Sequence, residues 1–141
     1  HWTQNRYALS RRLWRALCLR INMGAEYILV NESKKEIITF AHLNGAKMKE
    51  LVGNAAQSAI VTWYLLNNQG DQIQFVSDTD EYWPFETGSF KLAASYPDRT
   101  NEVIEVLIEN KILVDNGLLH VDKDEPDTIY TRDIVNVWCH D

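Results

Sequence analysis

Two short stretches of the chain combine residue types that could bind a metal ion. Residues 120–124 (HVDKD) place one imidazole and two carboxylates together at the end of an expected strand, which is how a metal-ligand set begins. No further ligand follows at a workable spacing, so a solvated loop with scattered acids is the preferred interpretation. Residues 78–81 (DTDE) have the carboxylates of a calcium loop but lack its glycine and its terminal glutamate. We therefore expect no metal, no cofactor and no small-molecule ligand.

The sequence offers equally little support for catalysis. Cys139 and His140 could supply a nucleophile and a base, but neighbours on a strand point to opposite faces and chain ends fray. The motifs that bind phosphates or dinucleotides, or that mark serine hydrolases and zinc proteases, are missing from the sequence. Cys18 and Cys139 lie near opposite ends of the chain, without the paired spacing of a zinc site. The sequence therefore predicts a protein that is not an enzyme, with two reduced thiols in the cytoplasm.

Positive charge is concentrated at the start of the chain. Residues 1–25 contain five arginines and no acidic residue, a charge of +5, whereas the other 9 Lys+Arg and 20 Asp+Glu give −11. Leucine or isoleucine recurs every four positions over 5–22, which predicts a basic amphipathic helix with Arg11, Arg12 and Arg15 on its polar side. Two interpretations remain open. The helix docks on the chain's own acidic body, or it contacts an anionic partner such as nucleic acid.

The composition predicts a single domain over residues 1–141. Apolar residues make up 45% and charged residues 24% of the chain, which is ordinary for a folded protein of this length. No apolar run is long enough to span a membrane. Residues 26–43 are predicted to form a β-hairpin, because β-branched and aromatic residues flank a polar turn.

A long helix is expected from about Ala46 to Asn67. Apolar and small residues recur there at the i, i+3, i+4, i+7 spacing of one helix face. The side chains predicted to be buried on that face are Ala55, Ala56, Ala59 and Trp63. Polar and apolar residues then alternate over 72–76, as they do in a half-buried strand.

Residues 88–121 have the order of a short segment, a break, a helix and a hairpin. The chain breaks at Pro97, and a helix is predicted over 98–111 because apolar residues recur at its spacing. Residues 115–117 (DNG) have the composition of a tight hairpin turn. Residues 122–127 (DKDEPD) are predicted to be the tip or the exit of the hairpin.

Two strand-like segments close the chain. They cover residues 128–131 and 134–138, where β-branched and aromatic residues are frequent. Trp138 lies in the second segment and, like Trp63, is expected to be buried in the core.

The span 49–138 resembles the winged-helix domains of phage and plasmid replication-organiser proteins and related prophage regulators. The matching features are a helix with small residues and a tryptophan, a glycine-containing connection, and a second helix followed by a small wing. They are carried by Val52-Gly53-Asn54-Ala55-Ala56 with Trp63, Asn68 with Gly70-Asp71-Gln72-Ile73, Leu92-Ala93, Leu107 with Ile112-Leu113, and Asn116-Gly117-Leu118-Leu119. The resemblance implies an α+β fold, in which a winged-helix-like body (46–138) follows the basic helix (1–25) and the hairpin (26–43).

The resemblance also implies a cytoplasmic regulatory or replication-accessory protein of mobile-element type that binds nucleic acid. The residues expected to contact nucleic acid are Arg11, Arg12, Arg15, Arg99 and Asn101. One departure from the family pattern opposes this function. The helix that would read DNA carries Glu102, Glu105 and Glu109, and these side chains repel phosphates.

The alternative function is a protein-interaction module, an adaptor or an inhibitor. It depends on the acidic loop 77–87 (SDTDEYWPFET), in which Tyr82, Trp83 and Phe85 are three large rings. Either the loop folds back over the core, or the rings form an anchor patch for a protein partner. An acidic surface of this kind suits a basic protein better than a polyanion, and a homodimer is the other assembly expected.

Overall fold

The computed structural model describes residues 25–139, and a three-stranded antiparallel sheet lies at its centre. Strand β1 (Tyr27–Asn31) lies between β2 (Glu36–Ile38) and β3 (Ile73–Ser77). Strand β1 is antiparallel to both neighbours, so the sheet is a β1–β2 hairpin with β3 added along the other edge of β1.

These strands match the sequence predictions. The hairpin predicted for 26–43 is confirmed as β1 and β2, and the strand predicted for 72–76 is confirmed as β3. The basic helix predicted for 5–22 lies outside the described residues.

Both faces of the sheet are buried, because alternate side chains of each strand enter different clusters. Leu29 pairs with Ile38 and Phe75, and all three contribute to the larger cluster. Val30 pairs with Ile37, and these two belong to a second cluster on the opposite face. Double-sided burial explains why β1 and β2 have consecutive apolar residues where a half-exposed strand would alternate.

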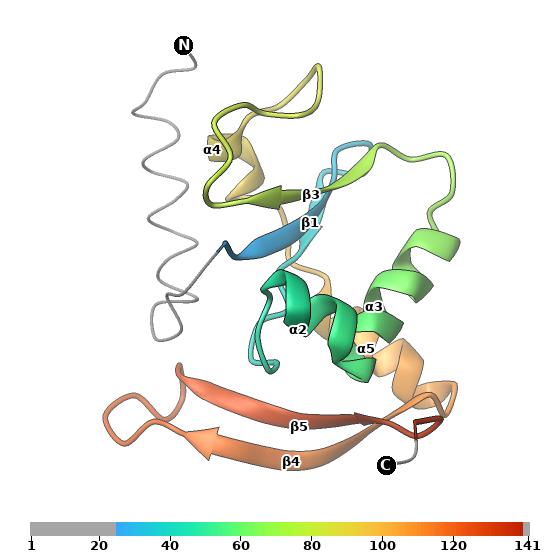
Figure 1. Cartoon of the computed structure of the whole chain (residues 1–141), viewed down its shortest axis with the longest axis vertical. Coiled ribbons are helices and arrows are strands. Elements are labelled where there is room, and N and C mark those ends of the chain that lie inside the picture. The colour runs from blue at the N-terminus through green and yellow to red at the C-terminus, as the bar shows by residue number, and fades with distance from the viewer. Residues whose placement is uncertain (1–24, 140–141) are drawn as a thin grey trace.

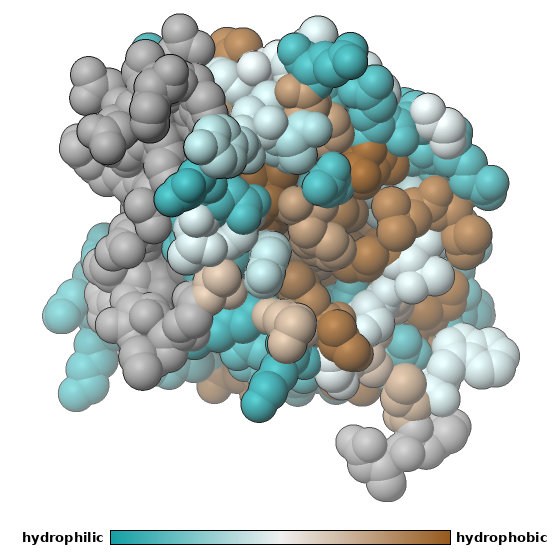
Figure 2. Space-filling model, turned by 45° about the horizontal axis from the view of Figure 1, so that its top comes forward, coloured by the Kyte–Doolittle hydropathy of each residue, from teal (hydrophilic) through white to brown (hydrophobic). Residues whose placement is uncertain are grey.

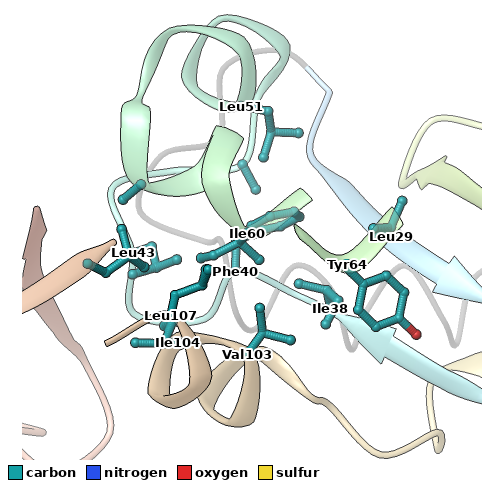
Figure 3. Close-up of a cluster of buried hydrophobic side chains, with 13 residues drawn as sticks. Leu29, Ile38, Phe40, Leu43, Leu51, Ile60, Tyr64, Val103, Ile104 and Leu107 are labelled. Carbon is teal, nitrogen blue, oxygen red and sulfur yellow. The ribbon is translucent and has the colours of Figure 1, made fainter. Parts of the chain in front are cut away.

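Three helices cover the first face of the sheet, and the hairpin at the end of the chain lies beyond them (Figure 1). They are α2 (Met48–Gly53), α3 (Ala55–Leu66) and α5 (Thr100–Glu109), the last of which confirms the helix predicted for 98–111. Figure 3 shows side chains from the sheet and from these helices converging on one cluster. Ile60 and Ile104 are completely buried there, and each side chain of this kind contributes about 1.5–3 kcal/mol to stability.

The prediction of one continuous helix from Ala46 to Asn67 is wrong. The chain has extended backbone at Asn54, with φ −85° and ψ 122°, between the end of α2 and the start of α3. This bend turns α2 away from the line of α3 and leaves Met48 62% and Val52 77% exposed. The buried side of α3 consists of Ala56, Gln57, Ile60 and Tyr64, whereas Ala55, Ala59 and Trp63 are half-buried.

The second face of the sheet is covered by α4 (Phe90–Ala93) and by the loop before it (Figure 1). Phe90 is completely buried and packs with Ile28, Val30 and Val76. The Ser89 hydroxyl accepts a hydrogen bond from the Leu92 amide and caps this short helix. The sheet is therefore the middle layer of three.

A buried carboxylate ties this outer layer to the sheet. Glu32 follows β1, and its side chain accepts hydrogen bonds from Tyr96 Oη at 2.7 Å and Thr87 Oγ1 at 2.9 Å, and also from Lys35 Nζ. Burial alone would raise the pKa of Glu32, but the three donors outweigh burial and lower the pKa. Residues on both sides of α4 are thereby attached to the end of β1.

A two-stranded hairpin ends the described chain. It pairs β4 (Leu113–Val121) with β5 (Tyr130–Asn136), and its tip is the DKDEPD loop at 122–127, as expected. The prediction of a tight turn at 115–117 is wrong, because these residues form a bulge inside β4. Gly117 has φ +104°, and its amide donates to Asp115 Oδ1 at 2.9 Å. The residues Asp-Asn-Gly suit a bulge as well as a tight turn, because both need a residue that readily adopts a positive φ.

The architecture confirms the α+β class. Helix α4, a break at Pro97, helix α5 and the β4–β5 hairpin follow one another in the order that the resemblance implies. The winged-helix assignment itself stays a prediction. Within residues 25–139, no helix has the length and apolar character needed to cross a membrane.

Replacing Ala56 with Glu is predicted to destabilise the fold. Ala56 is 7% exposed and belongs to the larger cluster, so Ala56→Glu buries an unpaired charge and should lower the unfolding free energy by about 3 kcal/mol or more. Thr62→Glu is the matched control, because Thr62 lies on the exposed side of the same helix and should change stability by less than about 0.5 kcal/mol. Urea unfolding of the three proteins measures both effects, and equal midpoints would contradict the assignment of the buried face.

Candidate functional site

A chain of polar side chains links the sheet to α3 and α5. Asn31 is completely buried at the end of β1, and its Nδ2 donates to Tyr64 Oη at 3.1 Å and to Asp71 Oδ2 at 2.8 Å. The Tyr64 hydroxyl donates to Glu36 of β2. Arg99 Nε donates to Glu36 Oε1 at 3.3 Å from the start of α5. These hydrogen bonds join β1 and β2 to α3 and to the start of α5.

A cavity of about 250 Å³ lies beside this network, between α3 and α5. Its lining is apolar on the side of the helices and charged where β2 and the start of α5 meet. The lining residues are Glu36, Trp63, Tyr64, Asn67, Asn68, Arg99, Glu102, Val103 and Val106.

The charged groups of the cavity are paired with one another. Arg99 lies 3.3 Å from a carboxylate oxygen of both Glu102 and Glu36, and these two hydrogen bonds raise the pKa of Arg99, with Glu102 as the larger cause. Burial, and then the hydrogen bond to Glu36, raise the pKa of Tyr64 far above its ordinary value. A tyrosine held protonated and an arginine held between two carboxylates do not exchange protons near neutral pH. Neither Tyr64 nor Arg99 is therefore suited to proton transfer near neutral pH.

The residues expected to touch nucleic acid at the start of α5 already have protein partners. Arg99 pairs with carboxylates, and Asn101 Oδ1 accepts a hydrogen bond from Arg132 at 3.0 Å. Asp98 Oδ1 accepts the backbone amide of Thr100 at 3.0 Å, where a phosphate oxygen would otherwise bind. The exposed side of α5 carries Glu102, Glu105 and Glu109. The structure brings Arg99 and Asn101 to one helix end, but it pairs Arg99 with two carboxylates and leaves the exposed side of the helix acidic.

Arg11, Arg12 and Arg15, the other residues predicted to bind nucleic acid, lie outside the described residues. The part of the chain that the structure describes, residues 25–139, contains 9 Lys+Arg and 19 Asp+Glu, a net charge of −10. Any attraction for a polyanion would have to come from the basic segment at the start of the chain.

Two of the three rings of the acidic loop fold back onto the second cluster. The centroid of the Trp83 ring lies 5.2 Å from that of Phe90 and 5.3 Å from that of Phe85. Trp83 Nε1 donates to the Thr87 carbonyl at 2.6 Å, so its polar edge is also satisfied. Tyr82 alone remains mostly exposed, at 73%. The loop therefore covers the core, and its anchor patch is reduced to one side chain.

The hairpin exposes a set of apolar side chains that sequence reasoning missed. Of the thirteen large hydrophobic side chains exposed in residues 25–139, seven lie between 113 and 138. They are Val114, Leu118, Leu119, Val121, Val135, Val137 and Trp138. The expectation that Trp138 belongs to the core is wrong, since it is 75% exposed. The sequence did contain one sign of this exposure, the consecutive Leu118 and Leu119. Adjacent strand residues point to opposite faces, so the two cannot both face one core.

Metal binding finds no geometric support in the described residues. Among residues 25–139, no three His, Cys, Asp or Glu side chains are grouped closely enough to hold an ion. His120 is exposed on β4, and Cys139 is an exposed free thiol.

Comparisons with protein-family models, with curated proteins and with solved structures find no match to this chain. Functional inference therefore depends on the charges, the contacts and the exposure of the described residues.

Removing one hydroxyl from the polar network is predicted to destabilise the protein. Tyr64→Phe deprives Asn31 and Glu36 of their shared partner and should lower the unfolding free energy by about 1–3 kcal/mol. Tyr82→Phe, at a mostly exposed tyrosine, is the control and should have an effect below about 0.5 kcal/mol. Chemical denaturation curves compare the two variants. If Tyr64→Phe were as stable as Tyr82→Phe, the network would not stabilise the contact of the sheet with α3 and α5.

Proposed function

We propose that this protein is a non-enzymatic regulatory protein that acts by binding another protein, with the β4–β5 hairpin as its docking surface. The observation that carries this proposal is the concentration of exposed apolar side chains on one element. Seven of the thirteen such side chains lie on the hairpin or directly after it. Exposed apolar side chains that gather on one element are typical of sites that contact another protein or a membrane.

The composition of this surface suits an interface. Leucine and valine side chains line the strands, and Trp138 follows β5 with 75% of its surface exposed. Tryptophan is the residue type that most often contributes a large share of binding energy. Other exposed apolar side chains are spread over α2, α3 and α4, and Figure 2 shows apolar side chains that reach the surface among hydrophilic ones on one face of the molecule.

The outer edge of β4 supports the same use. In residues 25–139, β4 pairs with β5 alone, so a nine-residue strand has one hydrogen-bonded neighbour. The other strand is held on its far side, because the Arg132 amide donates to the His42 carbonyl at 2.7 Å and Tyr130 stacks on the His42 ring. An edge with unpaired amides and carbonyls can accept a strand from a partner.

Charge indicates which partner the surface favours. Residues 113–136 contain six Asp and Glu against two Lys and Arg. These acids, four of which lie in the tip loop at 122–127, and the bulge at Gly117 discourage pairing with another copy of the same hairpin. An extended apolar segment flanked by lysines or arginines would meet both the apolar strand and its acidic surroundings.

The hairpin variant Leu118→Asp with Leu119→Asp tests this proposal. Two added charges at side chains that are 58% and 62% exposed should weaken partner binding at least about tenfold, which corresponds to about 1.4 kcal/mol. Partners are identified by quantitative affinity capture from the source cell and then titrated as purified proteins. Met48→Asp with Val52→Asp, at two exposed apolar side chains of α2, is the matched control and should bind normally. Equal affinities of the two variants would overturn the hairpin as the docking surface.

A second candidate function, nucleic-acid binding in a mobile-element regulator or replication accessory, is favoured by the charge of +5 on residues 1–25. If Arg11, Arg12 and Arg15 contact phosphates, replacing all three with Gln should weaken binding and reduce its salt dependence by up to about three charges. Titrations with DNA and RNA at two salt concentrations measure this, and Arg99→Gln is the comparison that should change little. A parent protein that binds neither at low salt would exclude this candidate.

A further inference from the structure

Glu26 is a buried carboxylate without a hydrogen-bond partner among residues 25–139. The residue is 5% exposed, and in the described part of the chain neither Oε1 nor Oε2 has a donor. Its backbone is fixed, because the Glu26 amide donates to Asp78 Oδ1 at 3.2 Å and the Asp78 amide donates back to the Glu26 carbonyl at 3.2 Å. A carboxylate held in this position and left unpaired destabilises the fold unless a partner arrives.

The surroundings of this carboxylate are negatively charged. Burial is the main cause of a raised pKa at Glu26, followed by the negative charge of Glu50 and then, among smaller effects, that of Asp78. Among residues 25–139, Lys47 is the basic side chain that lowers the pKa of Glu26, and the Ala46 backbone amide lowers it by a smaller amount. Two acids and one base among the described residues leave an excess of one negative charge around Glu26.

The two neighbouring acids are held in place by the backbone. Glu50 Oε1 accepts the Lys47 amide at 2.9 Å, and its carboxylate lies against Gly45, where a Cβ atom would be 2.0 Å away. Gly45 has φ +92°, so this close approach and this turn both require glycine. The acidic positions are therefore part of the folded framework around Glu26.

We propose that Glu26, Glu50 and Asp78 form a binding site for one arginine side chain, and that this arginine comes from residues 1–24 of the same chain. The two unpartnered oxygens of Glu26 match the paired N–H donors of a guanidinium group, which binds carboxylates in a bidentate manner. An ammonium group has no such fork. A metal ion is a poorer occupant, since the described His, Cys, Asp and Glu residues form no group able to hold one.

The basic segment is the occupant with the strongest claim to this site. Its last arginine, Arg20, lies six positions before Glu26 in the sequence, and its five arginines are accompanied by no lysine and no acid. A tethered segment is present at an effective concentration on the order of millimolar, so it competes well with free cations. This inference is independent of the hairpin proposal, because it uses different residues and a different partner.

A set of double-mutant cycles tests the proposal in the full chain. Glu26→Gln is combined in turn with Arg6→Gln, Arg11→Gln, Arg12→Gln, Arg15→Gln and Arg20→Gln, and unfolding equilibria are measured for each set. For the arginine that occupies the site, the single change should raise the unfolding constant at least about fivefold in the parent and less than about twofold beside Glu26→Gln. Glu81→Gln, at an exposed acid, is the matched control and should couple to none of them. Absence of coupling for all five arginines would overturn the proposal.

A second measurement does not require Glu26 to be changed. Carboxylate carbon NMR titration should show Glu26 ionising at higher pH once its arginine is replaced, because the guanidinium no longer stabilises the charged form beside Glu50 and Asp78. An unchanged Glu26 titration in all five arginine variants would also overturn the proposal. Coupling that appears only as protein concentration rises would assign the arginine to a second copy and would refute docking within one chain.

Discussion

Two consecutive polar residues at the end of β1 hold the three layers of this protein together. Asn31 and Glu32 are both buried and point to opposite faces of the sheet. On one face Asn31 binds Tyr64 of α3, and on the other Glu32 accepts hydrogen bonds from Tyr96 and Thr87. Buried polar groups are favourable only when every acceptor and donor is matched. The sheet, the helical layer and the α4 layer are therefore arranged so that these two side chains remain satisfied.

The β4–β5 hairpin is only partly covered by the rest of the described chain. One side of the hairpin packs against α3 and α5, where Leu113 joins the larger cluster and Ile134 packs against it. No further element among the described residues covers the other apolar side chains of the hairpin, which remain exposed on an acidic background. A surface of this kind favours a partner that brings both apolar contacts and positive charge. The α5 helix also favours a protein partner over nucleic acid. Its exposed glutamates and the pairing of Arg99 with carboxylates leave no free positive charge there for phosphates.

Docking of the basic segment on Glu26 and binding of nucleic acid both depend on the uneven distribution of charge along the chain. An acidic body of net charge −10 over residues 25–139 is preceded by a segment that contains arginine as its only charged residue type apart from histidine. Opposite charges on one chain attract without the entropic penalty of bringing two molecules together. In the docking that we propose, one of these arginines binds the carboxylate of Glu26, which has no hydrogen-bond partner among residues 25–139. An arginine bound there would no longer be available to a phosphate, so docking and nucleic-acid binding compete for the same side chains.

Local patterns in the sequence determined the elements whose side chains follow one backbone period. Strand β3 and helix α5 were predicted in this way, because strand and helix geometry set the spacing of apolar residues directly. The hairpin at 26–43 was predicted from β-branched and aromatic residues around a polar turn, and the tip at 122–127 from its charged residues and its proline. The periodicity of 46–67 continues through Asn54, so it could not reveal the bend there, and Asp-Asn-Gly at 115–117 suits a bulge as well as a turn. Only the tertiary structure decided that Trp138 is exposed, that Asn31 and Glu26 are buried, and that Arg99 pairs with Glu36, 63 residues earlier. These outcomes depend on which distant segments contact one another, and the local spacing of residues does not determine those contacts.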